Sequence, residues 1–252
     1  MGRLDGRFAL VTGGGRGIGA ATAKLFAREG ATVGIMGKGQ ESLTRTQDEC
    51  RSENLEIETF VGDVAVKQDV DRAIDGFVER FGRIDILVNN AGMTMPSAFP
   101  DKTEEEWIRV LQVNLIGPFL CSQAATRHMR KAGRGKIVNV TSVRAIDHCG
   151  RAPVMDYSAA KAGVVNMTKT LAKELAPNIN VNAVAPGHTA TDIIAGLPEA
   201  TRQGMLAGTP LERFASTQDI ANAILFLSSA EFRKQLYSYD VVPEAEAAAT
   251  AL

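Results

Sequence analysis

The fold of this chain is decided by one stretch near its start, Phe8-Ala9-Leu10-Val11-Thr12-Gly13-Gly14-Gly15-Arg16-Gly17-Ile18-Gly19. An apolar run of strand type meets a glycine-rich turn, and residues 20–29 continue as a helical pattern that stops at Gly30. Glycines permit positive φ and let backbone N–H groups approach a pyrophosphate, while a helix N-terminus offers partial positive charge. An ordinary turn has a similar composition, but the place between a first strand and a helix favours a dinucleotide site. We expect this site to include Gly13, Gly15, Arg16, Gly17, Ile18 and Gly19.

Five further apolar runs alternate with helical patterns, at residues 32–35, 57–61, 84–88, 137–140 and 181–184. Near-continuous apolar strands are typical of a parallel sheet that is buried on both faces, and the segments between them can supply crossover helices. The sequence therefore predicts an α/β fold: a doubly wound, Rossmann-type parallel sheet with helices on both faces. Because no linker or shift in composition interrupts the 252 residues, we expect a single domain over 1–252.

Composition narrows the class of protein. Hydrophobic residues make up 45% of the chain, charged residues 23%, and the formal net charge is -1, which gives no support for nucleic-acid binding. No apolar run approaches the ~20 residues that span a bilayer, and the N-terminus has no secretory pattern, so we expect a cytoplasmic protein. Cys50, Cys121 and Cys149 are scattered and odd in number, which indicates reduced thiols and neither a disulfide framework nor a metal site.

The end of the second strand bears on the choice of cofactor. There the chain reads Gly37-Lys38-Gly39, without a carboxylate to bind a ribose 2′-hydroxyl. Lys38, together with Arg16, can instead pair with a 2′-phosphate, so we prefer NADP and keep NAD as possible. The alternative is that both residues are solvated surface cations.

Two later strand ends also carry candidates for cofactor contact. Asp63, followed by Val64, either accepts a hydrogen bond from an adenine amine or caps the next helix. The fourth strand runs into Asn90-Ala91-Gly92, a turn composition that lets a ribose approach the backbone closely.

A capping-box pattern, Thr103 with Glu106, predicts a long helix from there to about Lys131. This helix carries Asn114 in its middle. An Asn on an apolar helix face requires a hydrogen-bonding partner.

Tyr157 and Lys161 are spaced i,i+4, which places the phenol and the ammonium on one face of a helix. A cation about 5 Å away at an effective dielectric constant of ~20 favours phenolate by about 3 kcal/mol, or roughly two pKa units. The pair can then move protons near neutral pH. An amphipathic helix that carries a chance Tyr and Lys is the alternative.

The loops after the fifth and sixth strands lie at the edge where open parallel sheets bind ligands. They contain Ser142 and the run Pro186-Gly187-His188-Thr189-Ala190-Thr191, so we expect Ser142, Tyr157 and the second loop to converge on one crevice. Residues 188–213 are rich in small residues and form either a lid over substrate or an ordinary surface insertion.

Taken in order, these motifs resemble the short-chain dehydrogenase/reductase family: Thr12-Gly13…Gly17-Ile18-Gly19, Asn89-Asn90-Ala91-Gly92, Asn114, Ser142, Tyr157…Lys161 and Pro186-Gly187. The resemblance covers roughly residues 4 to 229. Within the family the chain is most similar to 3-oxoacyl-acyl-carrier-protein reductases and related carbonyl reductases.

The resemblance implies hydride transfer between a nicotinamide and a carbonyl carbon, with Tyr157 moving the hydroxyl proton. It further implies that Ser142 binds the carbonyl oxygen, that Lys161 lowers the pKa of Tyr157 and binds the nicotinamide ribose, and that Asn114 holds a water for proton relay. Cofactor contacts are implied for Pro186, Gly187, Thr189 and Thr191, although a branched aliphatic residue is more usual at position 189.

Two departures from the family pattern concern specificity and assembly. Arg144 and Ala145 replace small residues after Ser142, so Arg144 either meets an anionic substrate or forms a surface salt bridge. The tail, about 230–252, lacks the family's glycine-rich ending, although a last strand near 236–242 is possible. The family's helix interface implies a homodimer, and a homotetramer if the tail permits it.

Three functions follow from these observations. The preferred one is NADPH-linked reduction of a ketone or 3-oxoacyl compound, and an NAD-linked dehydrogenase of a secondary alcohol, diol or sugar is the alternative within the class. A non-catalytic dinucleotide sensor or scaffold is the alternative outside it, disfavoured because the four catalytic candidates are all present.

Overall fold

The computed structural model describes residues 2–146, 152–209 and 211–232. Its strands are β1 (Phe8–Thr12), β2 (Thr32–Gly37), β3 (Ile57–Val61), β4 (Ile86–Asn89), β5 (Gly135–Val140) and β6 (Ile179–Val184). Its α-helices are α1 (Gly17–Arg28), α2 (Gln40–Ser52), α3 (Lys67–Phe81), α4 (Glu104–Leu111), α5 (Gly117–Lys131), α6 (Met155–Glu174), α7 (Asp192–Ala195), α8 (Glu199–Ala207) and α9 (Thr217–Ser228). Two 3₁₀ turns, η1 (Phe99–Asp101) and η3 (Val143–Ala145), and one π turn, η2 (Gln112–Ile116), complete the described elements.

The described strands form one six-stranded parallel sheet in the order β3-β2-β1-β4-β5-β6. Val11 of β1 pairs with Ile35 on one side and with Val88 on the other, so the strand order reverses at β1. Ligands of open α/β sheets bind at such a switch point, outside the carboxyl ends of the strands. The predicted doubly wound fold is confirmed.

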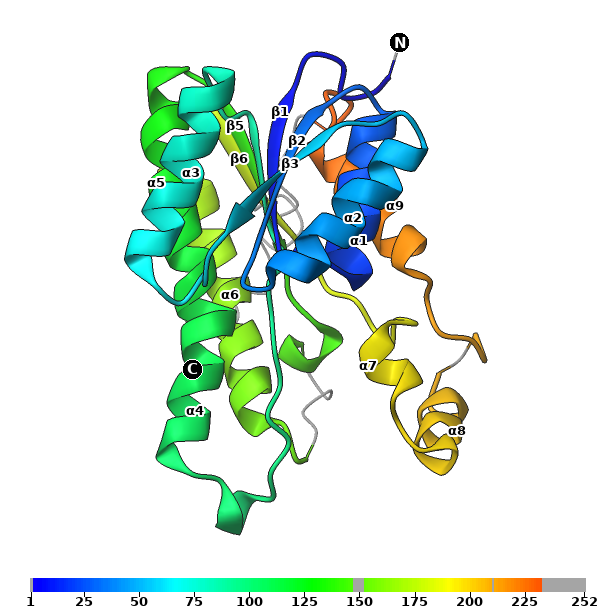
Figure 1. Cartoon of the computed structure of the whole chain (residues 1–252). Helices are drawn as coiled ribbons and strands as arrows, with labels where there is room; N and C mark the ends of the chain where they lie inside the picture. Colours follow the sequence, from blue (N-terminus) through cyan, green and yellow to red (C-terminus); the bar gives the residue numbers. More distant parts are fainter. Residues whose placement is uncertain (1, 147–151, 210, 233–252) are drawn as a thin grey trace, which may run out of the picture.

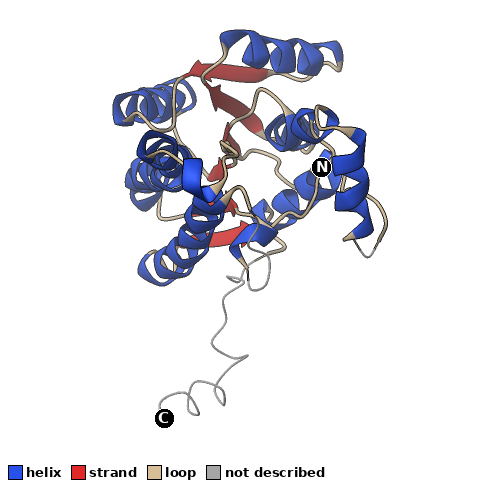
Figure 2. Ribbon diagram, turned by 90° about the horizontal axis from the view of Figure 1, so that it is seen from below, coloured by secondary structure: helices blue, strands red, loops and turns tan. Residues whose placement is uncertain are grey.

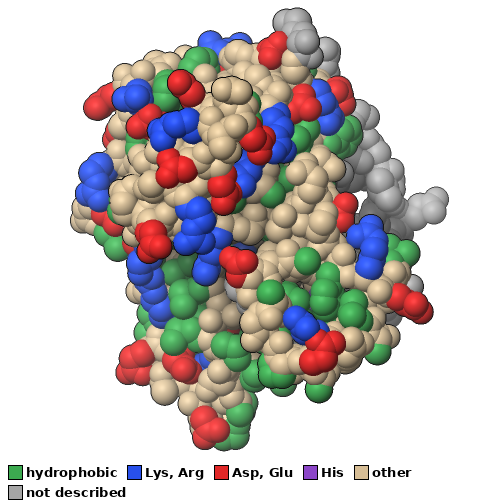
Figure 3. All heavy atoms as spheres, turned by 45° about the vertical axis from the view of Figure 1, so that its right-hand side comes forward, with side chains coloured by type: hydrophobic (Ala, Val, Ile, Leu, Met, Phe, Trp, Pro, Cys, Tyr) green, Lys and Arg blue, Asp and Glu red, His purple; other side chains and the backbone are tan. Residues whose placement is uncertain are grey.

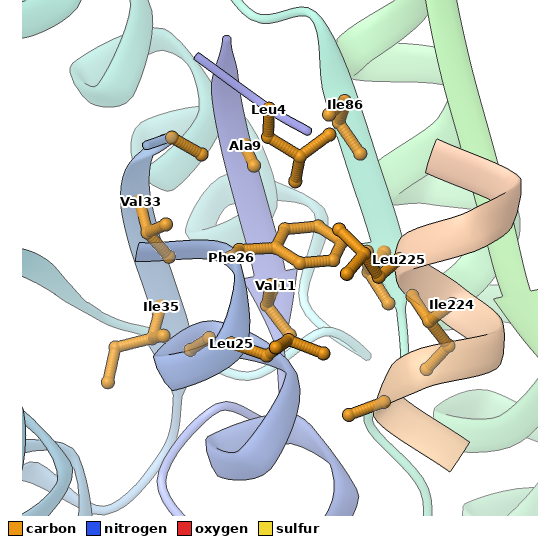
Figure 4. Packing of buried hydrophobic residues seen from close by; sticks show 14 of the residues in the cluster. Leu4, Ala9, Val11, Leu25, Phe26, Val33, Ile35, Ile86, Ile224 and Leu225 are labelled. Carbon is orange, nitrogen blue, oxygen red and sulfur yellow. The ribbon is translucent and has the colours of Figure 1, made fainter. Parts of the chain in front are cut away.

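Helices cover both faces of this sheet (Figures 1 and 2). One face is covered by α1, α2 and α9, and the other by α3, α5 and α6. Figure 4 shows Phe26 of α1 with Ile224 and Leu225 of α9 packed near Ala9 and Val11 of β1, all of them buried. These apolar layers hold the strands rigidly, so the loops at the strand ends have fixed positions.

The helix predicted from Thr103 to about Lys131 is present but not continuous. Thr103 and Glu106 form the predicted capping box, and α4 is followed by the π turn η2 before α5 begins. Within that turn the Asn114 side chain donates to the carbonyl of Val110, four residues earlier. A side chain that enters the helical hydrogen-bond ladder in this way is a known cause of local helix distortion.

Several expectations fall on residues outside the described ranges, namely the last strand near 236–242, the tail from 233 onward and the thiol of Cys149. Cys50 and Cys121 are buried and free. No helix in residues 2–146, 152–209 and 211–232 is long and apolar enough to cross a bilayer.

Candidate active site

Ser142 and Tyr157 meet beyond the carboxyl end of β5. Ser142 directly precedes η3, and its Oγ accepts a hydrogen bond from the backbone N–H of Arg144 at 3.1 Å. The next residue, Val143, donates to the carbonyl of Pro186 at 3.1 Å, which ties the loop after β5 to the loop after β6. Tyr157 lies in the first turn of α6, and its phenol is hydrogen-bonded to Ser142.

Lys161 lies one turn further along α6 and is 3% exposed. Its Nζ donates to the carbonyl of Val140 at 2.7 Å and lies 5.6 Å from the centroid of the Tyr157 ring. Burial lowers the pKa of Lys161 to about 8. The i,i+4 spacing therefore brings the phenol and the ammonium together, as the sequence predicts.

In the protein without cofactor, the net shift in the pKa of Tyr157 is upward, opposite to the direction expected from the pair. Burial of the phenol raises the pKa of Tyr157 above its ordinary value, and this outweighs the hydrogen bond from Ser142 and the charge of Arg144, which act in the opposite direction. Desolvation disfavours a phenolate more than these neighbours favour it. The spacing of residues in sequence contains no information on burial, so the sign was not predictable from it.

Asn114 reaches the same place from η2. Its Nδ2 donates to the carbonyls of Met93 (2.8 Å) and Val110 (2.9 Å), and its Oδ1 accepts from the N–H of Met93 (3.2 Å). A Cβ at Gly92 would lie 2.9 Å from Asn114 Oδ1 and 3.7 Å from Lys161 Nζ, so these three residues meet. Asn114 thus has the hydrogen-bonding partners that its position in a helix requires, and it fixes the chain after β4.

The glycine turn is shaped for close approach of a ligand to the backbone. Gly13 has a φ of +66°, and a Cβ at Gly19 would lie 2.2 Å from the carbonyl oxygen of Gly13. Asn90 Nδ2 donates to the carbonyls of Thr12 (3.0 Å) and Gly13 (3.3 Å), and Ala91 N donates to Thr12 Oγ1 (3.1 Å), which holds the turn against the loop after β4.

The N-terminus of α1 is open to an anion. Arg16, at the N-cap position, is in extended conformation and gives no side-chain cap, and the first turn, which lies entirely in the described range 2–146, has no acidic side chain. Gly15 lies against α2, where a Cβ would be 2.6 Å from Ser42 Oγ, and Ile18 packs on the core below. Uncapped N–H groups and a helix dipole fit the phosphates of a dinucleotide.

Lys38 and Asp63 are brought together at the ends of β2 and β3. Lys38 Nζ lies 3.2 Å from Asp63 Oδ2, and Arg109 Nη2 donates to the same oxygen at 2.7 Å. Burial opposes ionisation of Asp63, but the N–H of Ala65 and the two cations together hold its pKa below the ordinary value. The expectation that Asp63 caps the next helix is wrong, because α3 has Val66 at its N-cap. Val64 is buried beside the start of α5, where it lies against Gly117.

Arg109 was not among the residues predicted from sequence. It contacts Asp63 across 46 positions, and no local spacing signals such a pair.

The loop after β6 closes this side of the site. Thr189 is buried and its Oγ1 donates to the carbonyl of Gly187 at 3.2 Å. Thr191 precedes α7, and its Cγ2 lies 3.5 Å from the place of a Cβ at Gly17, so this loop contacts the glycine turn. Arg144 is half-buried, with Nη2 3.4 Å from Nε2 of His188.

Beyond this loop, residues of α7 and α8 line an open pocket of about 530 Å³. Figure 3 shows hydrophobic side chains gathered on the lower part of the molecule, where these two helices lie. The pocket is lined by apolar, polar and charged residues, among them Thr191, Ile194, Arg202, Leu206 and Phe214. The segment expected to be a lid therefore contains two short helices, which line one side of an open pocket.

Comparisons with known proteins agree with this geometry. Residues 7–202 match the family model for short chain dehydrogenases. The 3-oxoacyl-[acyl-carrier-protein] reductase FabG of Thermotoga maritima is 43% identical over 91% of this chain and 93% of its own length. The 3alpha-hydroxysteroid dehydrogenase of Mediterraneibacter gnavus is 40% identical, over 90% and 91%. Among solved structures, the crystal structure of gox2181 superposes with a TM-score of 0.87 at 33% identity, covering 90% of each chain.

The resemblance inferred from the motifs is thereby confirmed, including its closeness to 3-oxoacyl reductases. The chain belongs to the short-chain dehydrogenase family and is an NAD(P)-dependent oxidoreductase that acts on ketones or alcohols.

Proposed function

We propose that the protein is an NADPH-linked reductase of a ketone or 3-oxoacyl compound. The observation that carries this proposal is the meeting of Ser142, Tyr157 and Lys161 beside the loop after β6, which itself contacts the glycine turn. A proton donor and an oxygen-binding group therefore face the place where the geometry of the turn directs a dinucleotide. The relatives named 3-oxoacyl reductases support the same substrate class.

In this proposal each side chain has one role. Bound nicotinamide supplies the hydride. Tyr157 donates its proton to the carbonyl oxygen while Ser142 holds that oxygen by a hydrogen bond. Lys161 binds the nicotinamide ribose and, by its charge, favours the phenolate left on Tyr157, and Asn114 positions a water that returns the proton.

The preference for NADPH rests on the end of β2. Lys38 is 64% exposed, so its ammonium is free to exchange its ion pair with Asp63 for one with a 2′-phosphate. Arg16 is exposed at the start of α1 and supplies a second cation. The contacts with the pyrophosphate of the cofactor are assigned to Gly13, Gly15, Gly17, Ile18 and Gly19.

Further contacts of the cofactor are proposed for the other loops at this edge. They are Asp63, Val64, Asn90, Ala91, Gly92, Pro186, Gly187, Thr189 and Thr191. The two oxygens of Asp63 already accept from Ala65 and Arg109, so its contact with the adenine amine shares these acceptors.

An NAD-linked dehydrogenase of a secondary alcohol, diol or sugar is the second candidate within the class, and the relative named as a hydroxysteroid dehydrogenase favours it. Arg144, next to the reactive phenol, is assigned to an anionic group of the substrate, and residues 188–213 to a lid. We further propose a cytosolic homodimer formed through α4, α5 and α6.

The test compares wild type with Tyr157→Phe on a panel of charged and uncharged ketones and alcohols, each with NADPH, NADH and the oxidised forms. We expect turnover with NADPH and ketones, and a loss of about 100- to 10,000-fold in Tyr157→Phe, the usual contribution of a general acid. Cofactor binding measured by fluorescence should be unchanged in the variant. Full activity in Tyr157→Phe would overturn the proposal, and turnover confined to NAD and alcohols would favour the second candidate.

A further inference from the structure

A buried ion pair lies next to Tyr157 and has no part in the mechanism above. Lys102, just before α4, places its Nζ 3.0 Å from Oδ2 of Asp156, the second residue of α6. The Lys102 side chain is 4% exposed and Asp156 is 0% exposed. Lys102 Nζ also donates to the carbonyl of Met95, and Glu106 Oε2 lies 3.5 Å away.

The same carboxylate holds the first turn of the catalytic helix. Asp156 Oδ1 accepts from the backbone N–H of Tyr157 at 2.8 Å, so one carboxylate contacts both Lys102 and the candidate proton donor. Nearby, Ser97 N donates to the carbonyl of Pro153 at 3.2 Å, just before α6 begins. Residues 93–102 are therefore attached to the start of α6 at two places.

Asn114 attaches the beginning of this segment, through Met93, to η2. The segment thus connects the candidate ribose contact at Gly92 with the turn that carries Tyr157. Movement of the segment would change the distance between the cofactor contacts and the proton donor.

Packing alone does not explain why this contact is ionic. A buried ion pair is commonly no more stabilising than apolar side chains of the same volume, whereas loss of one partner leaves an uncompensated charge in a medium of low dielectric constant. Here such a charge would lie on Asp156, which binds the backbone N–H of Tyr157, or on its partner Lys102, and the ionisation of the Tyr157 phenol matters to the proposed reaction. The charged groups near Tyr157 are Arg144 from η3, Lys161 and Asp156 from α6, Glu106 from α4, and Lys102 just before α4. His188 contacts Arg144.

We propose that Lys102 and Asp156 are a positioning pair: they hold the first turn of α6 against residues 93–102, and their opposite charges cancel beside Tyr157. Asp156 fixes the backbone of Tyr157, and Lys102 neutralises the carboxylate that does so. The proposal rests on the proposed role of Tyr157 and adds two residues that act through it.

The test uses Lys102→Met, Asp156→Asn and the double variant, which removes both charges. Tyrosinate absorbance is titrated in the full chain without cofactor, and the same titration of each variant combined with Tyr157→Phe isolates the signal of this phenol. A unit charge within about 10 Å at an effective dielectric constant of ~20 shifts a pKa by about one unit. We expect the Tyr157 midpoint to rise by about one pH unit in Lys102→Met, to fall by about as much in Asp156→Asn, and to return to the wild-type value in the double variant.

Turnover of acetoacetyl-CoA with NADPH gives the second readout. The double variant has lost the ion pair that attaches residues 93–102 to α6, but the net charge beside Tyr157 is unchanged. Its kcat should therefore fall about tenfold while its affinity for NADPH stays within twofold. The exposed residues Lys131 and Asp5, which lie outside this segment, provide the controls Lys131→Met and Asp5→Asn, which should leave both readouts unchanged.

The proposed cancelling of charges would be overturned if the Tyr157 titration midpoint did not move, or if it moved in the same direction in both single variants. If a single variant does not fold, the double variant decides: wild-type kcat overturns the positioning role, and a tenfold loss with normal NADPH affinity supports it. Full activity of Tyr157→Phe would instead refute the proposed function, whatever the pair does.

Discussion

Among single residues, Lys161 combines a cationic group with almost complete burial. Burial lowers its pKa from 10.5 to about 8, so between these values the unfolded chain binds a proton that the folded chain does not. The free energy of unfolding must then rise with pH from about 8 to 10, by up to about 3 kcal/mol if the whole shift is realised. Above about pH 10 the raised pKa of Tyr157 acts in the opposite sense, which sets the upper limit of the test.

Urea denaturation of wild type and Lys161→Met at pH 7, 8, 9 and 10 measures this effect. The stability of the wild type relative to Lys161→Met should increase across the series, because the variant lacks the titrating group. Lys131→Met, at an exposed position, should follow the wild type. A difference between wild type and Lys161→Met that is independent of pH would show that the Lys161 ammonium is not destabilised by burial.

The sequence predicts contacts between residues that are close in sequence better than contacts between residues that are far apart in it. Tyr157 and Lys161 are an i,i+4 pair on one helix, and Ser142 follows a strand, so local spacing and the strand-end rule bring all three together. Lys102 and Asp156 are 54 positions apart, and only the packed structure brings them together. The direction of the Tyr157 pKa shift was missed for a related reason, since burial comes from the whole fold.

At the scale of the elements, the turn between β1 and α1 depends on the absence of side chains. A Cβ at Gly19 would lie 2.2 Å from the carbonyl oxygen of Gly13 and 2.5 Å from Asn90 Nδ2. We expect Gly19→Ala to lower the free energy of unfolding by about 1–3 kcal/mol, as overpacking usually does, and to weaken cofactor binding at least about tenfold. Thermal unfolding and fluorescence titration with NADPH measure the two effects.

The same substitution elsewhere in a helix provides the control. In α3, a Cβ at Gly76 would meet only Phe60 Cε1, at 3.8 Å, which is ordinary contact. Gly76→Ala should therefore stabilise the protein by about 0.5–1 kcal/mol and leave NADPH binding unchanged. Equal behaviour of the two variants would mean that the close approach at Gly19 is not required.

Element starts were more predictable than element interiors. The capping box at Thr103 and Glu106 marks the start of α4 because the signal lies within four residues. The π turn around Asn114 was not predicted, because a helical pattern in the sequence does not show that the Asn114 side chain donates to the Val110 carbonyl within the helix.

At the scale of the whole molecule, six apolar runs separated by helical patterns were sufficient to predict the parallel sheet and its two helical layers. The strand order was not predicted, because the alternation of strands and helices does not show which strand lies at the centre; the structure gives β3-β2-β1-β4-β5-β6, with the switch point at β1. The assembly of the chain is different, since it depends on surface side chains whose partners lie in another copy.

The surface that we assign to the proposed homodimer is a stripe on α4, η2 and α5. Ile108, Ile116 and Phe119 are 43%, 42% and 43% exposed, and they follow one another at helical spacing beside Gln112 and Gln123, which are also exposed. Three large apolar side chains in line on one exposed helix face are unfavourable in water and favour contact with a like surface. The stripe is continuous with the helix that carries Asn114, so a partner here would also support the site.

Phe119→Glu should therefore convert the protein from dimer to monomer at micromolar concentration, because the interface would have to bury two carboxylates related by symmetry. Light scattering coupled to size exclusion measures the change. Phe226→Glu is the matched control: Phe226 is also 43% exposed but lies on α9, on the other side of the sheet, so the dimer should persist. A wild-type monomer, or a dimer that survives Phe119→Glu and is lost in Phe226→Glu, would place the interface elsewhere. Since the stripe supports η2, the monomeric variant should also lose turnover while it keeps its fold, as judged by circular dichroism.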